Sequence, residues 1–333
     1  MLNPQDFSEG VTDVNTKNLN KITLALLVVV AVVFPFIADF YVLCIGISVL
    51  IAALLGQSWN IMSGYAGQFS FGHAVFFGIG AYTSTALYTM FGVSPWVGMI
   101  LGALLAALVG AIIGFLSFRY KLRDDYFALA TLAFAEIFRI LVNNTSALGG
   151  ATGILIPYLV KPSEYQFASD KTYYWVILAL VAFATVFIAV MSKSKTGLNL
   201  VAIKANQEAA AALGVNVLKY KLIAISSSAF FAALAGTFYA QYYGFIDPSI
   251  VFASSISVEA IVPCIIGGSG TLYGPLLGAL LIIPLQEICN SLFTSISGIN
   301  MIIYGVLIVL FIMFCPDGIY GRMTKYIEKR KGE

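Results

Sequence analysis

The sequence predicts an all-α, polytopic integral membrane protein, and its composition and apolar runs carry that prediction. Of its 333 residues, 60% are hydrophobic and only 10% are charged, whereas a soluble domain has about a quarter charged residues. The apolar runs are long and continuous, unlike the alternating segments of roughly ten residues that build a membrane β-barrel. These observations exclude a soluble enzyme, a disordered chain and a nucleic-acid-binding protein.

Apolar runs of spanning length divide the chain into about ten predicted transmembrane helices, since each span needs about 20 mostly apolar residues. The best-defined runs lie near residues 22–38, 41–56, 97–118, 127–142, 173–192, 222–243 and 301–315. Others are interrupted by glycine, proline or polar residues, and we expect broken or re-entrant segments there: 68–91, 254–267 and 271–293. Residues 1–20 form a polar tail, 21–316 the transmembrane domain and 317–333 a basic tail.

The basic residues predict which ends of the helices face the cytoplasm. Most of the 18 lysines and arginines fall in three groups, at 119–123, 193–221 and 322–331. The positive-inside rule places such groups in the cytoplasm, and even numbers of predicted spans separate them. Both termini are therefore expected inside the cell. The net charge of +2 is too small to imply an acidic partner.

Two glycine-rich stretches at membrane depth, residues 63–73 and 267–275, predict a transport pathway. Their backbone groups lack helical partners, which a membrane tolerates only inside protein or beside water. Interrupted segments in two separate parts of a chain point to a transport path, although each stretch alone also fits a tight turn. The candidate pathway residues are Gly67, Gln68, Ser70, His73, Glu259, Gly268 and Gly270.

Glycine spacing carries two further predictions about architecture. A row of small residues recurs every four positions along one predicted helix: Gly98, Gly102, Ala106, Gly110 and Gly114. Such a row lets another backbone approach closely; packing within the chain is the favoured interpretation, and a dimer interface is the alternative. Similar spacing in two triplets raises the hypothesis of an internal repeat: Gly67, Gly72 and Gly78, then Gly270, Gly274 and Gly278.

Ionisable side chains inside predicted spans are also candidates for function. A charge at the bilayer centre costs about 2.5–3.5 kcal/mol on insertion scales, so such residues should face protein or water. Glu136 and Arg139 lie three apart, which predicts a structural ion pair. Glu259 has no charged neighbour in the sequence, and the single histidine, His73, is expected to be structural. The sequence holds no phosphate-loop or hydrolase motif and no C-x-x-C pair, so no catalytic or metal site is predicted.

The longest predicted cytoplasmic loop, residues 193–221, holds a candidate docking helix. Its alanine-rich centre favours a short helix, which Gly214 can end in a left-handed turn. Such a short helix is marginal alone, so we expect a partner's groove to stabilise it. The candidate contact residues are Glu208, Ala209, Ala210, Leu213 and Gly214.

Residues 208–214 resemble the E-A-A-x-x-x-G loop of ATP-binding-cassette (ABC) importer permeases. Beyond that loop, the chain resembles LivM-type permeases, one of two membrane subunits of branched-chain amino acid ABC importers. The resemblance is carried by residues 63–82, by 126–133 together with Glu136 and Arg139, by 267–279, and by 316–319.

The resemblance implies a permease of the cell membrane that performs no covalent chemistry and holds no cofactor or metal. Its implied partners are a second homologous permease subunit, two ATPase subunits that bind the ATP, and an extracytoplasmic solute-binding protein. The solute stays open among branched-chain amino acids, other amino acids and urea. Rivals from other classes are an ion-coupled secondary transporter that uses Glu259 and Glu136, and an intramembrane enzyme centred on His73.

Overall fold

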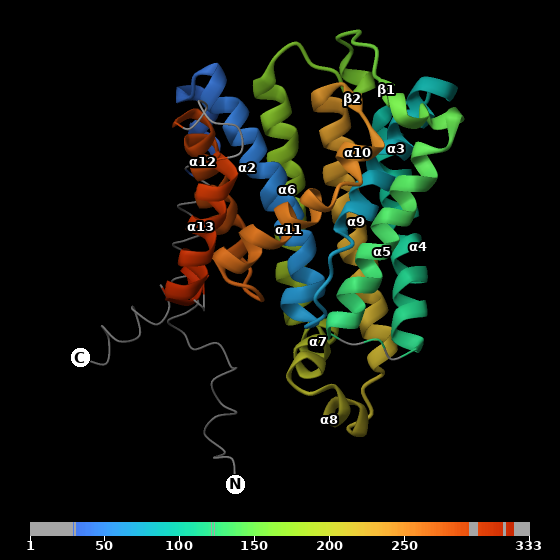
Figure 1. Cartoon of the computed structure of the whole chain (residues 1–333), viewed down its shortest axis with the longest axis vertical. Coiled ribbons are helices and arrows are strands. Elements are labelled where there is room, and N and C mark those ends of the chain that lie inside the picture. Colours follow the sequence, from blue (N-terminus) through green and yellow to red (C-terminus); the bar gives the residue numbers. More distant parts are fainter. Residues whose placement is uncertain are drawn as a thin grey trace, which may run out of the picture.

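The computed structural model describes residues 29, 31–120, 122, 124–292, 299–315 and 318–322. They form a bundle of long helices (Figure 1). The helices are α2 (Phe40–Trp59), α3 (His73–Phe91), α4 (Pro95–Arg119), α5 (Asp124–Asn143), α6 (Asp170–Lys193), α7 (Lys195–Ala205), α8 (Gln207–Ala212), α9 (Val217–Tyr243), α10 (Pro248–Val251), α11 (Ser254–Gly267), α12 (Gly274–Leu292) and α13 (Ile299–Phe314). The predicted tail 1–20 lies outside the described residues, and only residues 318–322 of the tail 317–333 are described. The first predicted span, 22–38, is described in part, and its residues 31–37 are helical.

The prediction of an all-α membrane fold is confirmed. Seven helices in the described part of the chain are long and apolar enough to cross a membrane. Helices α5 and α13 match the predicted spans at 127–142 and 301–315 and run alongside the others (Figure 1). Both glycine-rich stretches interrupt helical structure, as expected. Helix α2 continues as a π-helical turn, η2 (Asn60–Tyr65), before α3 begins at His73, and residues 268–273 separate α11 from α12. The internal repeat stays a prediction.

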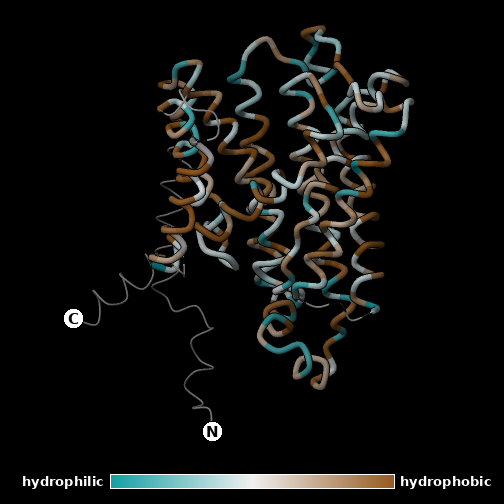
Figure 2. Tube along the Cα trace, in the orientation of Figure 1, coloured by the Kyte–Doolittle hydropathy of each residue, from teal (hydrophilic) through white to brown (hydrophobic). Residues whose placement is uncertain are grey.

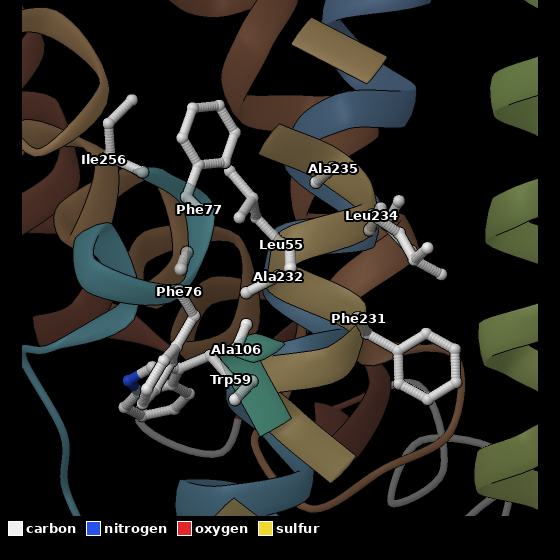
Figure 3. Packing of buried hydrophobic residues seen from close by; sticks show 14 of the residues in the cluster. Leu55, Trp59, Phe76, Phe77, Ala106, Phe231, Ala232, Leu234, Ala235 and Ile256 are labelled. Atoms are coloured by element: carbon white, nitrogen blue, oxygen red, sulfur yellow. The ribbon is translucent and has the colours of Figure 1, made fainter. Parts of the chain in front are cut away.

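The glycine row of α4 packs against α3 and α9, so the prediction of packing within the chain is confirmed. A Cβ on Gly98 would lie 2.9 Å from the Cα of Ser84, and one on Gly110 would lie 2.9 Å from the Cβ of Ala229. Small residues permit this close approach of helix backbones. Figure 3 shows small and large side chains interleaved in the buried core: Leu55, Trp59, Phe76, Phe77, Ala106, Phe231, Ala232, Leu234, Ala235 and Ile256.

The two ends of the bundle carry different structures. The short helices α7 and α8 lie at one end, and the strands β1 (Ile154–Leu155) and β2 (Phe245–Ile246) lie at the other (Figure 1). The strands pair antiparallel, with Ile154 opposite Ile246. Figure 2 shows hydrophobic chain along the middle of the bundle and more hydrophilic chain toward its ends. This separation of the 193–221 loop from the 143–172 connection fits the predicted topology, in which only the former faces the cytoplasm.

Candidate functional site

The two glycine-rich stretches lie far apart in the sequence, yet they meet at the end of α2. Asn60 joins them, because its Nδ2 donates to the carbonyl of Thr271 at 2.8 Å and its Oδ1 accepts from the N–H of Gly270 at 2.7 Å. Gln57, one turn earlier, donates to the carbonyl of Leu272 at 2.9 Å. Side chains of α2 and its π-helical turn therefore satisfy backbone groups that the break between α11 and α12 leaves without helical partners.

Glycine is required where these backbones approach each other. A Cβ on Gly64 would collide with the Asn60 amide and lie 2.7 Å from the nitrogen of Gly270. Gly67 and Gly270 have φ values of +69° and +82°, a region that side chains with a Cβ rarely adopt. These predicted pathway residues therefore lie together, in a crossing between residues 63–73 and 267–275 that we call the glycine crossing.

The 193–221 loop reaches the glycine crossing through Lys204, near the end of α7. The Lys204 Nζ donates to the carbonyl of Gly64 at 2.7 Å. A Cβ on Gly67 would lie 2.8 Å from the Lys204 Cγ, and one on Gly270 would lie 3.4 Å from its Nζ. The sequence marked Lys204 only as one of a group of basic residues. Nothing in the pattern of residues around Lys204 predicted that its side chain would contact both interrupted stretches.

The short helix expected in this loop forms as α8, while its docking role stays a prediction. Asn206 caps α8, because its Oδ1 accepts from the N–H groups of Glu208 and Ala209, each at 3.0 Å, and such a cap stabilises a helix start. Helix α8 ends at Ala212, and Gly214 follows with φ +88°. At the start of α9, the buried Lys221 donates to the Oε1 of Gln207 at 2.5 Å and anchors α8 to the bundle.

The candidate contact residues of this loop divide by exposure. Leu213 is 86% exposed, and Glu208, Ala209 and Gly214 are also exposed. Ala210 is buried, 4% exposed, so it packs within the chain instead of facing a partner. An exposed leucine beside small residues offers an apolar contact at the tip of the loop, in line with a docking role.

His73 ties three helices together. Its Nε2 lies 2.8 Å from the Oγ of Ser228 in α9, while that Oγ donates to the carbonyl of Ser58 at 2.7 Å. Because the hydroxyl proton of Ser228 is committed to Ser58, the bonding assigns the shared hydrogen to the Nε2 of His73. In a nucleophilic pair the histidine would instead accept the serine proton. The geometry is therefore that of a structural tie between α2, α3 and α9.

The other predicted pathway residues of the two stretches are held by bonds in the same region. The Ser70 carbonyl accepts the indole N–H of Trp59 at 2.9 Å. The backbone carbonyl of Gln68 accepts from the Oγ of Ser63 at 2.7 Å. The side-chain Oε1 of Gln68 is buried and has no hydrogen-bond partner among the described residues. Gly268 begins the second break with φ +120°.

Glu259 is the candidate pathway residue that lies outside the glycine crossing. It faces a cavity of about 230 Å³ between α2, α3, α9, α11 and α12. The cavity lining includes a second carboxylate, Glu287, together with Gln286, Tyr239 and Tyr243. Only tertiary packing brings Glu287 beside Glu259, so sequence periodicity gave no reason to pair them.

Glu136 and Arg139 form the predicted ion pair. The Nε of Arg139 donates to the Oε2 of Glu136 at 3.0 Å, and the Nη2 contacts the Oε1. The pair is not packed inside the bundle, because the Arg139 side chain is 32% exposed and the Glu136 side chain is 51% exposed. The sequence predicted the pairing but not this outward orientation.

Comparisons with known proteins relate the chain to transport permeases. A family model described as "Branched-chain amino acid transport system / permease component" matches residues 40–312. The chain is 31% identical to the high-affinity branched-chain amino acid transport system permease protein LivM of Salmonella typhimurium, over 94% of this chain and 78% of the relative. It is 26% identical to the LivH permease protein of the same organism, over 81% of this chain and 91% of the relative. A solved structure of PsaBC from Streptococcus pneumoniae in complex with Fab matches with 15% identity and a TM-score of 0.47, over 87% of this chain and 96% of that chain.

Proposed function

This chain belongs to the family of permease components of branched-chain amino acid transport systems, and we propose that it is one membrane-spanning subunit of an ABC importer of branched-chain amino acids. The observation that carries the proposal is the contact between the 193–221 loop and the glycine crossing. Lys204 joins the carbonyl of Gly64 to a loop whose tip exposes Leu213. Under this proposal, a movement of the loop tip would reach both broken stretches through Lys204.

In the proposed mechanism, two ATPase subunits close on ATP and displace α8. The contact residues would be Glu208, Ala209, Leu213 and Gly214, with Ala210 supporting α8 from inside. Helix α7 would carry the movement through Lys204 to Gly64, and the glycine crossing would then change which side of the membrane the pathway opens to. Gly67, Gln68, Ser70, His73, Gly268 and Gly270 would act here as parts of a moving joint.

The proposed partners follow from the same family relationship. The chain is similar both to LivM and to LivH, which supports a second, homologous permease subunit beside it. We also propose two ATPase subunits, which would bind the ATP, and an extracytoplasmic binding protein that delivers the solute. The basic groups would place α7, α8 and the C-terminus in the cytoplasm of a multi-pass cell-membrane protein.

The chain itself would catalyse no reaction and need no cofactor or metal. The proton of Ser228 bonds to Ser58 and leaves His73 without a nucleophile to activate, which opposes an intramembrane enzyme. The acidic cavity at Glu259 is the observation that favours the second candidate, an ion-coupled transporter, because two carboxylates beside aromatic rings suit a cation.

Reconstitution tests the proposal. The chain is co-expressed with the ATPase and permease proteins that co-purify with it, placed in liposomes, and supplied with loaded binding protein. We expect leucine, isoleucine and valine uptake that requires ATP on the cytoplasmic side and persists without a proton gradient. Uptake that needs the gradient and no ATPase would establish the ion-coupled alternative, and uptake of urea but not leucine would change the solute.

A further inference from the structure

The Glu136–Arg139 pair lies in the second half of α5. Phe127, near the start of α5, stacks its ring on that of Phe118 in α4, with the ring centroids 5.1 Å apart. Phe118 is the penultimate residue of α4. At a rise of about 1.5 Å per residue, Glu136 lies about 13 Å and Arg139 about 18 Å farther along α5. With Phe127 taken as one boundary of a hydrocarbon core about 30 Å thick, both charges fall inside that core.

At this depth the pair occupies the outer face of α5. The inward side is buried through Phe127, Thr131 and Ala135, whereas the charged side chains are 32% and 51% exposed. Charged residues at the bilayer centre are rare, and they almost always face a bundle interior or a water-filled cavity. This face of α5 therefore cannot be an ordinary lipid-facing surface, and it must be covered by protein or by water.

We propose that this face of α5 lines the translocation pathway between the chain and its second permease subunit, and that Glu136 and Arg139 bind there the zwitterionic head group of an amino acid. The Arg139 guanidinium would take the carboxylate, for which its planar donors are suited, and Glu136 would accept from the ammonium. The inference rests on the proposed function, because it names the group of the solute that the pathway recognises.

The pair suits a site that must fill and empty. In the empty state the two side chains neutralise each other at hydrogen-bond distance, so neither is left as an isolated charge at membrane depth. When a zwitterion enters, each side chain exchanges its partner for one end of the solute, and the net charge of the site does not change. Exposed neighbours on α5, Ile137 and Ile140, offer apolar contacts to an aliphatic side chain.

The acidic cavity fits such a solute less well. Among the described residues, its lining contains Glu259 and Glu287 and no lysine or arginine, so these residues offer a partner for an ammonium group but none for a carboxylate. The α5 pair offers both. Of the charged groups at membrane depth in the described chain, this pair is therefore the better complement to a zwitterion.

Two double variants test the inference in the reconstituted complex with ATPase subunits and loaded binding protein. The variant Glu136→Gln/Arg139→Gln removes both charges together, so it leaves no unpaired ion. The variant Glu136→Arg/Arg139→Glu keeps an ion pair but reverses its direction along the helix. The control Lys161→Gln/Glu164→Gln removes another i,i+3 pair, in the connection before α6. Leucine uptake and ATP hydrolysis are measured at equal amounts of assembled complex.

We expect both α5 variants to lose uptake by about tenfold or more, equivalent to about 1.4 kcal/mol, while ATP hydrolysis continues and the control transports normally. Uptake within about twofold of wild type by the reversed pair would overturn the inference in favour of a structural pair. The same result with the neutral pair would also overturn it. If the wild-type complex shows no ATP-driven uptake, the proposed function fails instead, so the two failures are distinguishable.

Discussion

Replacing Lys204 by methionine tests the connection between the cytoplasmic loop and the glycine crossing. Methionine keeps an unbranched stem beside Gly67, where a glycine Cβ would lie 2.8 Å from the Lys204 Cγ. It removes the ammonium group that donates to the carbonyl of Gly64 at 2.7 Å. The substitution thus separates the hydrogen bond from the packing of the stem.

The magnitude follows from the type of bond that is lost. A hydrogen bond that involves a charged group contributes about 1.5–3 kcal/mol, and the lower end applies because the Lys204 side chain is partly exposed to water. A loss of about 1.5 kcal/mol changes about tenfold the ratio of the state in which Lys204 holds Gly64 to the state in which the two are separated. Because the movement of α7 would then reach the glycine crossing less often, we expect uptake per ATP hydrolysed to fall about tenfold.

The assay measures ATP hydrolysis and leucine uptake in the same reconstituted complex. Lys219→Met is the matched control, because Lys219 is an exposed lysine of the same loop and the change removes the same charge. The expected result is continued hydrolysis with reduced uptake for Lys204→Met, and normal values of both for the control. An unchanged ratio of uptake to hydrolysis in Lys204→Met would refute the reasoning, as would an equal loss in Lys219→Met.

Further predictions concern docking, packing and pH. Ala209→Asp should release the ATPase subunits during purification without lowering the melting temperature, whereas Ala210→Asp should lower it because Ala210 is buried; equal melting temperatures would contradict this distinction. Gly236→Ala should destabilise the chain by about 1–3 kcal/mol through overpacking, because the added Cβ would collide with a backbone carbonyl of α3. Gly305 has open space around it, so Gly305→Ala should be neutral in the same thermal unfolding assay. A hydrogen bond from the Tyr88 hydroxyl of α3 lowers the pKa of the Glu164 carboxyl below its ordinary value. The stability that this bond contributes is therefore present above the unfolded pKa and lost as the pH falls through the folded pKa, and Glu164→Gln should flatten this acid dependence in unfolding curves.

Local features of this chain were predictable from the sequence because their causes are local. The breaks follow from glycines such as Gly67 and Gly270, which adopt positive φ values, and α8 follows from its alanines, with Gly214 ending the helix. The bond between Lys204 and Gly64 joins residues 140 positions apart, and no periodicity encodes that distance. Only the assembled bundle brings them together.

The direction in which a helix face points was the least predictable feature. Lipid tails are as apolar as a leucine side chain, so hydrophobic periodicity does not separate the lipid-facing side of a membrane helix from its buried side. The spacing of Glu136 and Arg139 predicted the ion pair, but it carried no information about exposure. In the same way, Ala209 and Ala210 are identical in type, and only the contacts of α8 show that one is buried and the other exposed.

Under the proposed function, the glycine crossing connects the cytoplasmic loop to the α5 pair as well. The N–H of Phe71, in the first broken stretch, donates to the Oγ1 of Thr131 in α5 at 3.0 Å, and a Cβ on Gly72 would lie 2.8 Å from the Cβ of that threonine. Thr131 is buried and lies between one and two helical turns before Glu136. A displacement that enters at Lys204 would therefore pass through residues 64–72 into the helix that carries the proposed solute-binding pair. Glycine is required along this route for a steric reason: a Cβ on Gly67 or Gly72 would lie 2.8 Å from the side chain of Lys204 or Thr131. The absence of these Cβ atoms lets the stretch lie close enough to hydrogen-bond to both residues, so it would move together with them.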